Sequence, residues 1–535
     1  MPSLPASAFP EGLVVYQIYP RSFQDSDNDG VGDIPGIISR LDYVQDLGVN
    51  AIWLSPFYPS PMVDFGYDIA NYTDVDPAFG TLADFDELVR QAHRRGMRII
   101  IDLVANHTSD QHSWFTESRS SRHNPKRDWY IWHDGRGNGQ PPNNWLSTFG
   151  GPAWRFDDRT NQYYLHSFFT PQPDLNWRNP AVRTAIKEVM RFWLERGIDG
   201  FRMDAVPWIG KDERLRDDPL NPHYNPATMT PYHQHIPRFS TAAPNMFAYL
   251  KELAAVLAAY PSTFMIVEAY PASNNSNQIY TELYRQVDPR IIAPFNFDGI
   301  FTPWQASAFK KFIDTFQASL LPGDVPIYAL GNHDHARLRS RFGEQATRGA
   351  ALLLATLPGA SVMYYGDELG LPNVHIPPHE VQDPVAPHAI AGLPTRDFVR
   401  TPMQWTPGLQ AGFSQHTPWL PLDPHYRTMN VLTQSADPTS LLNLYKKLLR
   451  LRHTSPALRA GAYQPLHATS PHVFGYFRHA AGTNGEKLAV VINFSPTESA
   501  TVPVHGQELF ATHAAESPHR LLPGEGKIIR ISGGD

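Results

Sequence analysis

Residues Gly200 to Trp208 read GFRMDAVPW, and this stretch places an arginine and an aspartate inside an apolar run. Short apolar runs of this kind are typical of strands buried in a parallel sheet, where an unpaired charge is costly. Arg202 and Asp204 have the same parity, so on a strand both side chains point to one face. The stretch therefore predicts a buried strand that carries a guanidinium and a carboxylate side by side.

Similar apolar runs recur along the chain and alternate with helical patterns. Residues 85–92 place apolar side chains at helical spacing, and basic residues before Gly96 mark the end of that helix. Asn179 and Pro180 begin a second helix, which Gly197 ends. The eight predicted strands are GLVVYQIYP (Gly12–Pro20), AIWLSP (Ala51–Pro56), RIIIDLVANH (Arg98–His107), GFRMDAV (Gly200–Val206), FMIVEAY (Phe264–Tyr270), APFNFD (Ala293–Asp298), PIYALGNHD (Pro326–Asp334) and SVMYYGDE (Ser361–Glu368).

This alternation predicts an α/β fold, a (β/α)8 TIM barrel, although a doubly wound sheet gives a similar alternation. The gap of about ninety residues between the third and fourth strands is far longer than a βα loop, which predicts an inserted small domain. Short β-runs near the C-terminus predict an all-β domain. We predict the first part of the barrel at residues 1–105, the inserted domain at 106–176, the second part of the barrel at 177–457 and a C-terminal β-sandwich at 458–535.

Composition argues against several classes of function. The formal net charge of −7 gives no basic footprint for nucleic acid. The chain has no cysteine, which excludes disulfides and thiolate metal sites and fits a reducing compartment. The N-terminal stretch has no basic start followed by a long apolar run, so we expect no signal peptide, no membrane partner and a cytoplasmic location.

Polar residues stand at the ends of four predicted strands. In a barrel the carboxyl ends of the strands surround one mouth, so these distant positions would converge. Any one of them could instead cap the next helix, and the Arg202–Asp204 pair could be a purely structural ion pair. Their coincidence at four strand ends favours a functional site. They are Asp102 with Asn106 and His107, Arg202 with Asp204, Glu268, and His333 with Asp334.

The stretches DLVANH, GFRMDAV, IVEAY and GNHD resemble the four signature regions of the α-amylase superfamily of glycoside hydrolases. VVYQIYPRSF, DFGYDI, PPNNWLSTFGG, YYLHSFFTPQPDLNW and RTPMQW are similar to motifs of its α-glucosidase and oligo-1,6-glucosidase branch. The likeness runs in order from about Leu13 to Ala460. It implies a retaining enzyme without an organic cofactor, acting on short α-glucosides such as maltose, isomaltose or sucrose.

By the same resemblance, Asp204 is the nucleophile, Glu268 the general acid/base and Asp334 the carboxylate that stabilises the transition state. A retaining glycosidase needs two carboxyls about 5 Å apart, one to attack the anomeric carbon and one to protonate the leaving oxygen. We expect Arg202 to lower the pKa of Asp204 and keep it ionised. We expect the apolar run before Glu268 to raise the pKa of that carboxyl.

Further residues resemble those that line the family's glucose pocket. Asp64 and Arg400 resemble the pair that grips the distal hydroxyls and closes the pocket, which implies release of glucose from the non-reducing end. Tyr67 would stack under the sugar ring. The remaining substrate-binding candidates are His107, Phe149, Phe168, Gln172, Arg202 and His333. As an alternative, the two phenylalanines belong to the core and the histidines are structural.

The stretch DSDNDGVGD (Asp25–Asp33) follows the first strand and begins like an EF-hand loop. Its twelfth position is Gly36, where an EF-hand needs a bidentate glutamate, so an EF-hand is excluded. Closely spaced carboxylates can still bind one hard cation, and members of the resembled family bind Ca²⁺ or Mg²⁺ at a matching loop. The alternative is a solvated acidic turn. The candidate ligands of this structural ion are Asp25, Asp27, Asp29, Val31 through its carbonyl, and Asp33.

Two rival functions share this sequence pattern. The first is a transglycosylase or sucrose isomerase on the same scaffold, in which another hydroxyl takes the glucosyl group. The second is a non-catalytic relative such as the ectodomain of amino-acid transporter heavy chains. Those carry a membrane span and a degraded site, and we find neither feature in this sequence. Ala205 bears on linkage: in the resembled branch a valine after the nucleophile accompanies α-1,6 cleavage and a threonine α-1,4 cleavage, and alanine is neither.

Overall fold

The structure, a computed structural model, describes residues 8–270, 276–385, 395–482, 485–514 and 517–531. Eight parallel strands close into a barrel in the order β1-β11-β10-β9-β8-β7-β3-β2. All eight predicted strands are confirmed, and the closed order excludes the doubly wound alternative. The strands are β1 (Val14–Ile18), β2 (Ala51–Leu54), β3 (Arg98–Leu103), β7 (Gly200–Met203), β8 (Phe264–Val267), β9 (Ile292–Asn296), β10 (Ile327–Ala329) and β11 (Ala360–Tyr364).

The strands end earlier than the predicted runs, because hydrogen bonding between neighbours stops before the apolar sequence does. β7 ends at Met203, so Asp204 is the first residue beyond it. Asp102 lies inside β3 and is in register with Arg202 of β7. Asp334 stands five residues past the end of β10 at Ala329. The candidate residues therefore lie at or just beyond the carboxyl ends of the strands, the end of a barrel that carries active sites.

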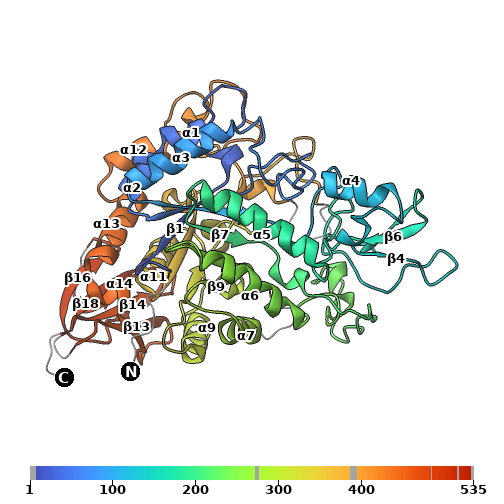
Figure 1. Ribbon diagram of the computed structural model, residues 1–535. Helices are drawn as coiled ribbons and strands as arrows, with labels where there is room; N and C mark the ends of the chain where they lie inside the picture. Colours follow the sequence, from blue (N-terminus) through green and yellow to red (C-terminus); the bar gives the residue numbers. More distant parts are fainter. Residues whose placement is uncertain (1–7, 271–275, 386–394, 483–484, 515–516, 532–535) are drawn as a thin grey trace.

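Helices surround the barrel (Figure 1). The predicted helix before Gly96 is α3, which begins with a capping box between Thr81 and Asp84. The helix predicted after Asn179 is α5, where Asn179 accepts a hydrogen bond from the Ala181 N–H. The helices are α1 (Ile34–Ser39), α2 (Leu41–Leu47), α3 (Leu82–Arg94), α5 (Pro180–Glu195), α6 (Asn245–Leu257), α7 (Ser276–Gln286), α8 (Asp298–Phe301), α9 (Ala306–Ser319), α10 (Leu338–Phe342), α11 (Ala346–Thr356), α12 (Val431–Ala436), α13 (Leu441–Thr454) and α14 (Pro456–Ala460).

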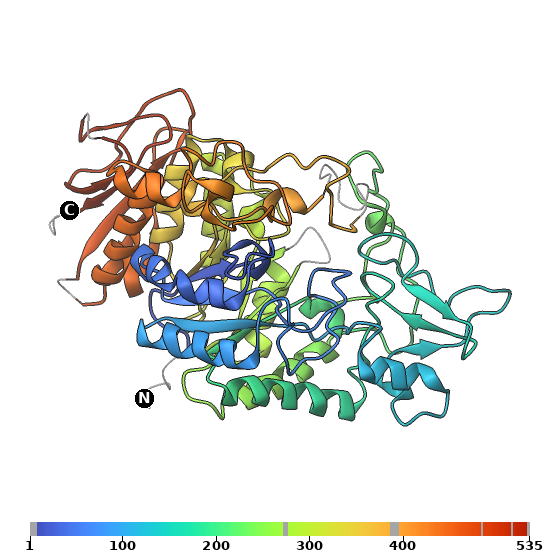
Figure 2. The same cartoon turned by 90° about the horizontal axis from the view of Figure 1, so that it is seen from above.

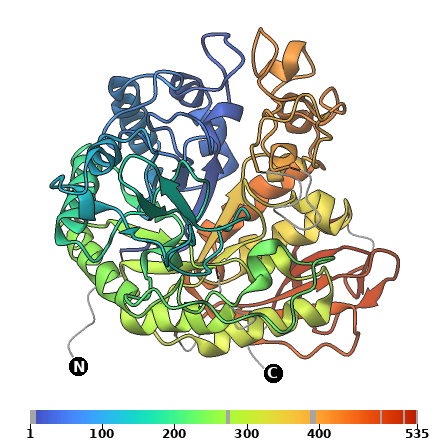
Figure 3. The ribbon, with the colours of Figure 1, turned by 90° about the vertical axis from the view of Figure 1, so that its right-hand side faces the viewer.

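The segment between β3 and α5 forms a small unit beside the barrel. It contains α4 (Ser113–Ser120) and the antiparallel strands β4 (Trp132–His133), β5 (Trp154–Asp157) and β6 (Gln162–Leu165), in the order β4-β6-β5. These strands have an apolar cluster of their own around Trp145 and Trp154. In Figures 1 and 2 this unit lies on the side of the barrel opposite the C-terminal strands, and Figure 3 shows it in front of the barrel.

The C-terminal region is all-β, as predicted. Its main sheet is antiparallel, in the order β12-β13-β14-β18-β16, and β15 pairs with β17. Helix α11 of the barrel packs against β14 and β18, which holds the sheet on the barrel. The strands are β12 (Ala462–Pro465), β13 (Val473–His479), β14 (Lys487–Asn493), β15 (Ala500–Thr501), β16 (Gln507–Ala511), β17 (Arg520–Leu521) and β18 (Gly526–Arg530). Within the described residues, no helix combines the length and apolar character that crossing a bilayer requires.

Candidate active site

One guanidinium contacts three buried carboxylates at the carboxyl end of the barrel. Arg202 Nη1 lies 2.6 Å from Asp102 Oδ1 and 2.7 Å from Asp204 Oδ1. Its Nη2 lies 2.7 Å from Glu268 Oε1. The arginine side chain is 1% exposed, so these charge-assisted bonds form away from water, where an unpaired charge would be costly. Asp204 and Glu268 are thereby held side by side.

The turn after β7 is fixed to the end of β8 by two backbone N–H groups that donate to Glu268, one to its side chain and one to its carbonyl. The Ala205 N–H donates to Glu268 Oε2 at 3.0 Å, and the Val206 N–H donates to the Glu268 carbonyl at 3.0 Å. Ala205 has φ 47°, in the left-handed region that is uncommon for residues other than glycine. A strained backbone at this point places the residue that follows Asp204 directly against Glu268.

The pKa of the Asp204 carboxyl is raised well above its ordinary value. Burial is the largest cause, the neighbouring Glu268 carboxylate is the second, and the Arg202 charge lowers the pKa without cancelling them. The Arg202 charge lowers the pKa of Asp204 in the direction we predicted, but burial and the Glu268 carboxylate outweigh it, so the guanidinium alone does not set the charge of Asp204. Two carboxyls bridged by one guanidinium do not both ionise readily, and a retaining mechanism uses one ionised and one protonated carboxyl. Such a pair can act as one acid and one nucleophile.

The pKa of the Asp334 carboxyl is shifted in the opposite direction, downward. Arg400 Nη2 lies 2.7 Å from its Oδ1, and Arg396 Nη1 lies 3.5 Å from the same oxygen. Burial alone would raise the pKa of the Asp334 carboxyl, but His333 and the two guanidinium groups outweigh burial and hold that pKa well below its usual range. Asp334 is therefore held as an ionised carboxylate, in contrast to Asp204, whose pKa is raised.

Asp64 pairs with Arg396 and not with Arg400, which corrects our prediction. Arg396 Nη2 lies 2.7 Å from Asp64 Oδ1, and the other Asp64 oxygen accepts a hydrogen bond from Gln172 at 3.0 Å. Arg400 is occupied elsewhere, since its Nε donates to the His333 carbonyl and its Nη2 contacts Asp334. A turn of 3-10 helix separates the two arginines, so that both approach Asp334 but only Arg396 also contacts Asp64.

Five of the charged residues described above face one cavity of about 450 Å³, a size typical of small-molecule sites: Asp64, Asp204, Glu268, Asp334 and Arg396. Its polar residues come from loops that follow several different strands, and much of its wall is aromatic. The lining residues are Asp64, Tyr67, His107, Thr148, Phe149, Phe168, Asp204, Ala205, Pro207, Trp208, Thr230, Tyr232, His233, Pro237, Thr241, Glu268, Tyr270, Phe301, Asp334, His335 and Arg396.

Tyr67 lines the cavity and lies flat on His333. The two rings are stacked with centroids 5.4 Å apart, and the Tyr67 hydroxyl is 2.8 Å from His333 Nε2. His333 itself is buried, with Nδ1 2.8 Å from the Gln17 amide nitrogen, and burial lowers its pKa well below the ordinary value. His333 therefore supports Tyr67 from outside the set of residues that line the cavity.

Of the remaining predicted pocket residues, three line the cavity and one lies behind the lining residues and bonds to them. Phe149 and Phe168 line the cavity with ring centroids 5.7 Å apart and are only half-buried, which argues against a core role for them. His107 also lines it, and burial lowers its pKa. Gln172 is fully buried behind the wall, where its amide bonds Asp64 and lies 3.1 Å from His107 Nε2.

The sequence predictions missed several residues that belong to this site. Arg396 is the main one, together with Asp383, which binds it. The only sequence signal was a second arginine four residues before the RTPMQW motif. The sequence predictions also missed the buried Lys211, which donates to the carbonyl of Trp208 in the cavity wall, and four aromatic residues of that wall. Those four are Trp208, Tyr232, Tyr270 and Phe301.

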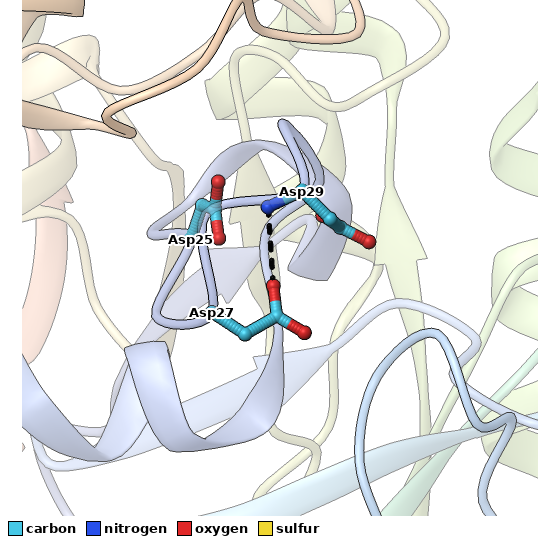
Figure 4. A group of neighbouring side chains, drawn as sticks. All are labelled: Asp25, Asp27 and Asp29. Atoms are coloured by element: carbon cyan, nitrogen blue, oxygen red, sulfur yellow. Dashed lines mark hydrogen bonds between the residues drawn. The ribbon is translucent and has the colours of Figure 1, made fainter.

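The acidic loop after β1 lies apart from this cavity. Asp25, Asp27 and Asp29 each offer a carboxylate oxygen, and these atoms lie within 4.8 Å of one another (Figure 4). Burial and the neighbouring Asp29 carboxylate raise the pKa of Asp27. Asp33 is placed differently, because its carboxylate caps helix α1 through the Gly36 N–H and also accepts from Ser26. The group of three is the part of the predicted ligand set that the structure brings together.

Comparisons with known proteins show the family to which this chain belongs. The family described as alpha amylase, catalytic domain, matches residues 17–461. An alpha-glucosidase of Apis mellifera is 41% identical over 499 residues, covering 91% of this chain and 86% of its own. An oligo-1,6-glucosidase of Parageobacillus thermoglucosidasius is 38% identical over 517 residues, covering 90% of each. The solved structure of XgtA, an alpha-glucosyl transfer enzyme, is 38% identical with a TM-score of 0.90, covering 98% of this chain and 100% of its own.

Proposed function

Because the chain belongs to the α-amylase catalytic-domain family, we propose that it is a retaining α-glucosidase that releases glucose from the non-reducing end of short α-glucosides. The observation that carries this proposal is the bridge of Arg202 between Asp204 and Glu268, which face one cavity together with Asp334. This is the pair of neighbouring carboxyls that retention of configuration requires.

The reaction proceeds in two displacements. In the first, an Asp204 oxygen forms a bond to the anomeric carbon while Glu268 gives its proton to the glycosidic oxygen, whose bond to that carbon breaks. In the second, Glu268 takes a proton from water, the water oxygen bonds to the anomeric carbon, and Asp204 leaves. The ionised Asp334 stabilises the positive charge that develops on the sugar ring in both steps.

The test is the anomer of glucose formed in the first moments of hydrolysis, followed by NMR. Two inversions give α-glucose first, and β-glucose first would exclude a covalent intermediate on Asp204. Asp204→Asn should remove nearly all activity and keep the fold, because the amide is almost isosteric but cannot attack. Glu268→Gln should spare substrates with good leaving groups, which depend less on the acid.

Azide separates the roles of the two carboxyls when the substrate is activated. In a Glu268→Ala variant, azide attacks the β-linked intermediate on Asp204 and should give the α-glucosyl azide. In an Asp204→Gly variant no intermediate forms, so azide displaces the α-leaving group directly and should give the β-glucosyl azide. The same azide anomer from both variants would contradict the separate roles assigned here.

Transfer of glucose to a hydroxyl other than water is the second candidate. The likeness to an alpha-glucosyl transfer enzyme along the whole chain favours it, and both reactions share the glucosyl-enzyme intermediate. Product chromatography separates them: free glucose indicates hydrolysis, longer glucosides indicate transfer, and a rearranged disaccharide from sucrose indicates isomerisation. Maltose, isomaltose, sucrose, trehalose and starch form the substrate panel, because Ala205 indicates neither an α-1,4 nor an α-1,6 preference.

We further propose that Asp25, Asp27 and Asp29 bind one structural Ca²⁺ or Mg²⁺ ion. Three carboxylates with oxygens within 4.8 Å of one another form a hard, anionic donor set suited to such a cation. The Val31 carbonyl is a further candidate ligand, whereas Asp33 would support the loop as the cap of α1. The ion would neutralise the crowded charge of the loop and has no part in the reaction.

We also propose a cytoplasmic location. The support is compositional: the chain has no cysteine, which suits a reducing compartment. Cell fractionation followed by an activity assay would test it.

A further inference from the structure

Arg396 occupies a central position among the charges of the cavity wall. Its Nη2 lies 2.7 Å from Asp64 Oδ1, and its Nη1 lies 3.5 Å from Asp334 Oδ1. Its guanidinium carbon is 5.4 Å from the centre of the Phe149 ring. The side chain is only 6% exposed, so its direction depends on fixed contacts with the protein and not on solvent.

Asp383 supplies most of those fixed contacts. Its Oδ2 accepts hydrogen bonds from the Arg396 backbone N–H at 2.8 Å and from Nε at 3.0 Å. Its Oδ1 accepts from Nη2 at 2.8 Å. The carboxylate therefore binds one edge of the guanidinium in a bidentate fork, a geometry that fixes the plane of the group as well as its position.

This fork decides which hydrogens of Arg396 remain for the cavity. Nε is used by Asp383, and one of the two hydrogens on Nη2 is used as well. The second hydrogen of Nη2 then points to Asp64, and Nη1 is directed toward Asp334. Asp383 does not line the cavity, and its own side chain is fully buried.

We infer that Asp383 is a positioning residue, which acts on the sugar only through Arg396 by holding that guanidinium between Asp64 and Asp334. The inference rests on the proposed glucosidase function. It assigns to the QDP stretch at residues 382–384 a task in recognising glucose.

A purely structural role is the competing explanation, and Asp397 shows what such a role looks like. Asp397 Oδ2 accepts the backbone N–H groups of Gln382 and Asp383, and within the described part of the chain its side chain bonds no residue that lines the cavity. Asp397 therefore joins the segment around residue 397 to residues 382–383 through the backbone. Asp383, in contrast, accepts hydrogen bonds from the guanidinium of Arg396 itself. The two roles predict different kinetics.

The experiment compares Asp383→Asn with the wild-type enzyme and with Asp324→Asn. Asp324 also has a buried side chain paired with an arginine, Arg285, at 2.9 Å, but it lies outside the cavity lining. We expect Asp383→Asn to lower kcat/KM for maltose or 4-nitrophenyl α-glucoside by about 100-fold, the scale of a group misplaced by 1 Å. Asp324→Asn should keep kcat/KM within about twofold, because its partners Arg285 and Leu321 lie outside the cavity lining. Asp383→Glu, which keeps the charge, should recover part of the loss.

A double-mutant cycle with Arg396→Met tests whether the effect of Asp383→Asn on kcat/KM depends on Arg396. If Asp383 acts only through Arg396, then Asp383→Asn should change kcat/KM by less than about threefold in the Arg396→Met background. Full additivity of the two losses would overturn the inference. So would a lower Tm with unchanged kcat and KM in Asp383→Asn, because that result identifies a structural role.

A crystal structure of Asp383→Asn keeps the inference testable if the wild-type enzyme proves inactive on α-glucosides. Arg396 should then have left Asp64, and an unmoved guanidinium would overturn the inference. An inactive wild type with a displaced Arg396 in the variant would instead refute the proposed function alone.

Discussion

At the scale of single residues, neighbours and burial hold the carboxyls of the barrel in different protonation states. Asp334 is ionised by its arginines, whereas burial raises the pKa of Asp102 to about 6 despite the Arg202 charge. Asp367, just beyond β11, has its pKa raised to about 7, first by burial and also by the neighbouring Glu368. These differences come from the environment, since free aspartates share one ordinary pKa.

The raised pKa of Asp367 predicts a dependence of stability on pH. A carboxyl whose pKa is higher in the folded state favours folding below its unfolded pKa, and this contribution is lost as the pH rises through about 7. The loss between pH 4 and 7 is on the order of a few kcal/mol. Asp367→Asn removes the titration. The Tm of this variant minus the Tm of the wild type should therefore be larger at pH 8 than at pH 5.

Asp42→Asn is the control for this measurement, because the Asp42 side chain is 85% exposed. Its Tm difference from the wild type should be the same at both pH values. A Tm difference for Asp367→Asn that also stays constant would show that Asp367 does not titrate in this range.

Arg396 shows which part of the site could not be predicted at this scale. The roles of Asp204, Glu268 and Asp334 follow from motifs in which the residue and its surroundings are local in sequence. The partner of Asp64 is 332 positions away, and two arginines four residues apart were equally available to it. Only the turn between them, together with the Asp383 fork, decides which one reaches Asp64.

At the scale of elements, Lys211 connects three segments that surround the cavity. Its Nζ lies 2.9 Å from Asn106 Oδ1 after β3, 2.9 Å from Asp174 Oδ2 in the inserted segment, and also donates to the Trp208 carbonyl after β7. It is 7% exposed, and the Asp174 side chain is fully buried. One cation therefore fixes the inserted segment against the loop that follows the nucleophile.

Lys211→Met should be strongly destabilising, because it leaves the buried Asp174 without its cation. The expected loss is about 3 to 5 kcal/mol, seen as a Tm lower by several degrees. The double variant Lys211→Met with Asp174→Asn should recover part of the Tm, since no unpaired charge then remains. Equal Tm values for Lys211→Met and the wild type would contradict this account.

The loop between β1 and α1 gives a second prediction at this scale. If Asp25, Asp27 and Asp29 bind a cation, exhaustive chelation should lower the Tm, because a ligand that binds only the native state stabilises it. Asp29→Ala should lower the Tm similarly and make it insensitive to chelation. Added Ca²⁺ or Mg²⁺ should restore the Tm of the chelated wild type but not that of the variant. An unchanged Tm after chelation would count against the site.

At the scale of the whole molecule, the order of strands and helices could be predicted because each element has a recognisable pattern in its own stretch of sequence. Each barrel strand is a continuous apolar run, and helices such as α3 and α5 carry their own caps. What could not be predicted are the contacts that close the site between distant segments. They include Lys211 with Asp174, the Arg396 network, and the aromatic side chains that loops bring to the cavity wall.

Those contacts lead to a prediction about substrate size. Phe149 and Phe168 of the inserted segment, Trp208 and Tyr232 after β7, and Phe301 after β9 enclose the cavity from several sides. Asp64 and Arg396 join two further loops across it. We therefore expect chain ends to enter this cavity of about 450 Å³ and the interior of a polymer to be excluded from it.

Soluble starch should therefore be hydrolysed much more slowly than maltose or maltotriose at equal concentrations of non-reducing ends. The early product should be glucose alone, because only the terminal residue reaches Asp204 and Glu268. Chromatography of the first few per cent of reaction measures this directly, and a starch sample with blocked non-reducing ends is the control that should not react. Long maltooligosaccharides among the first products would mean that the polymer passes through an open cleft, and the pocket formed by Asp64 and Arg396 could not then be closed.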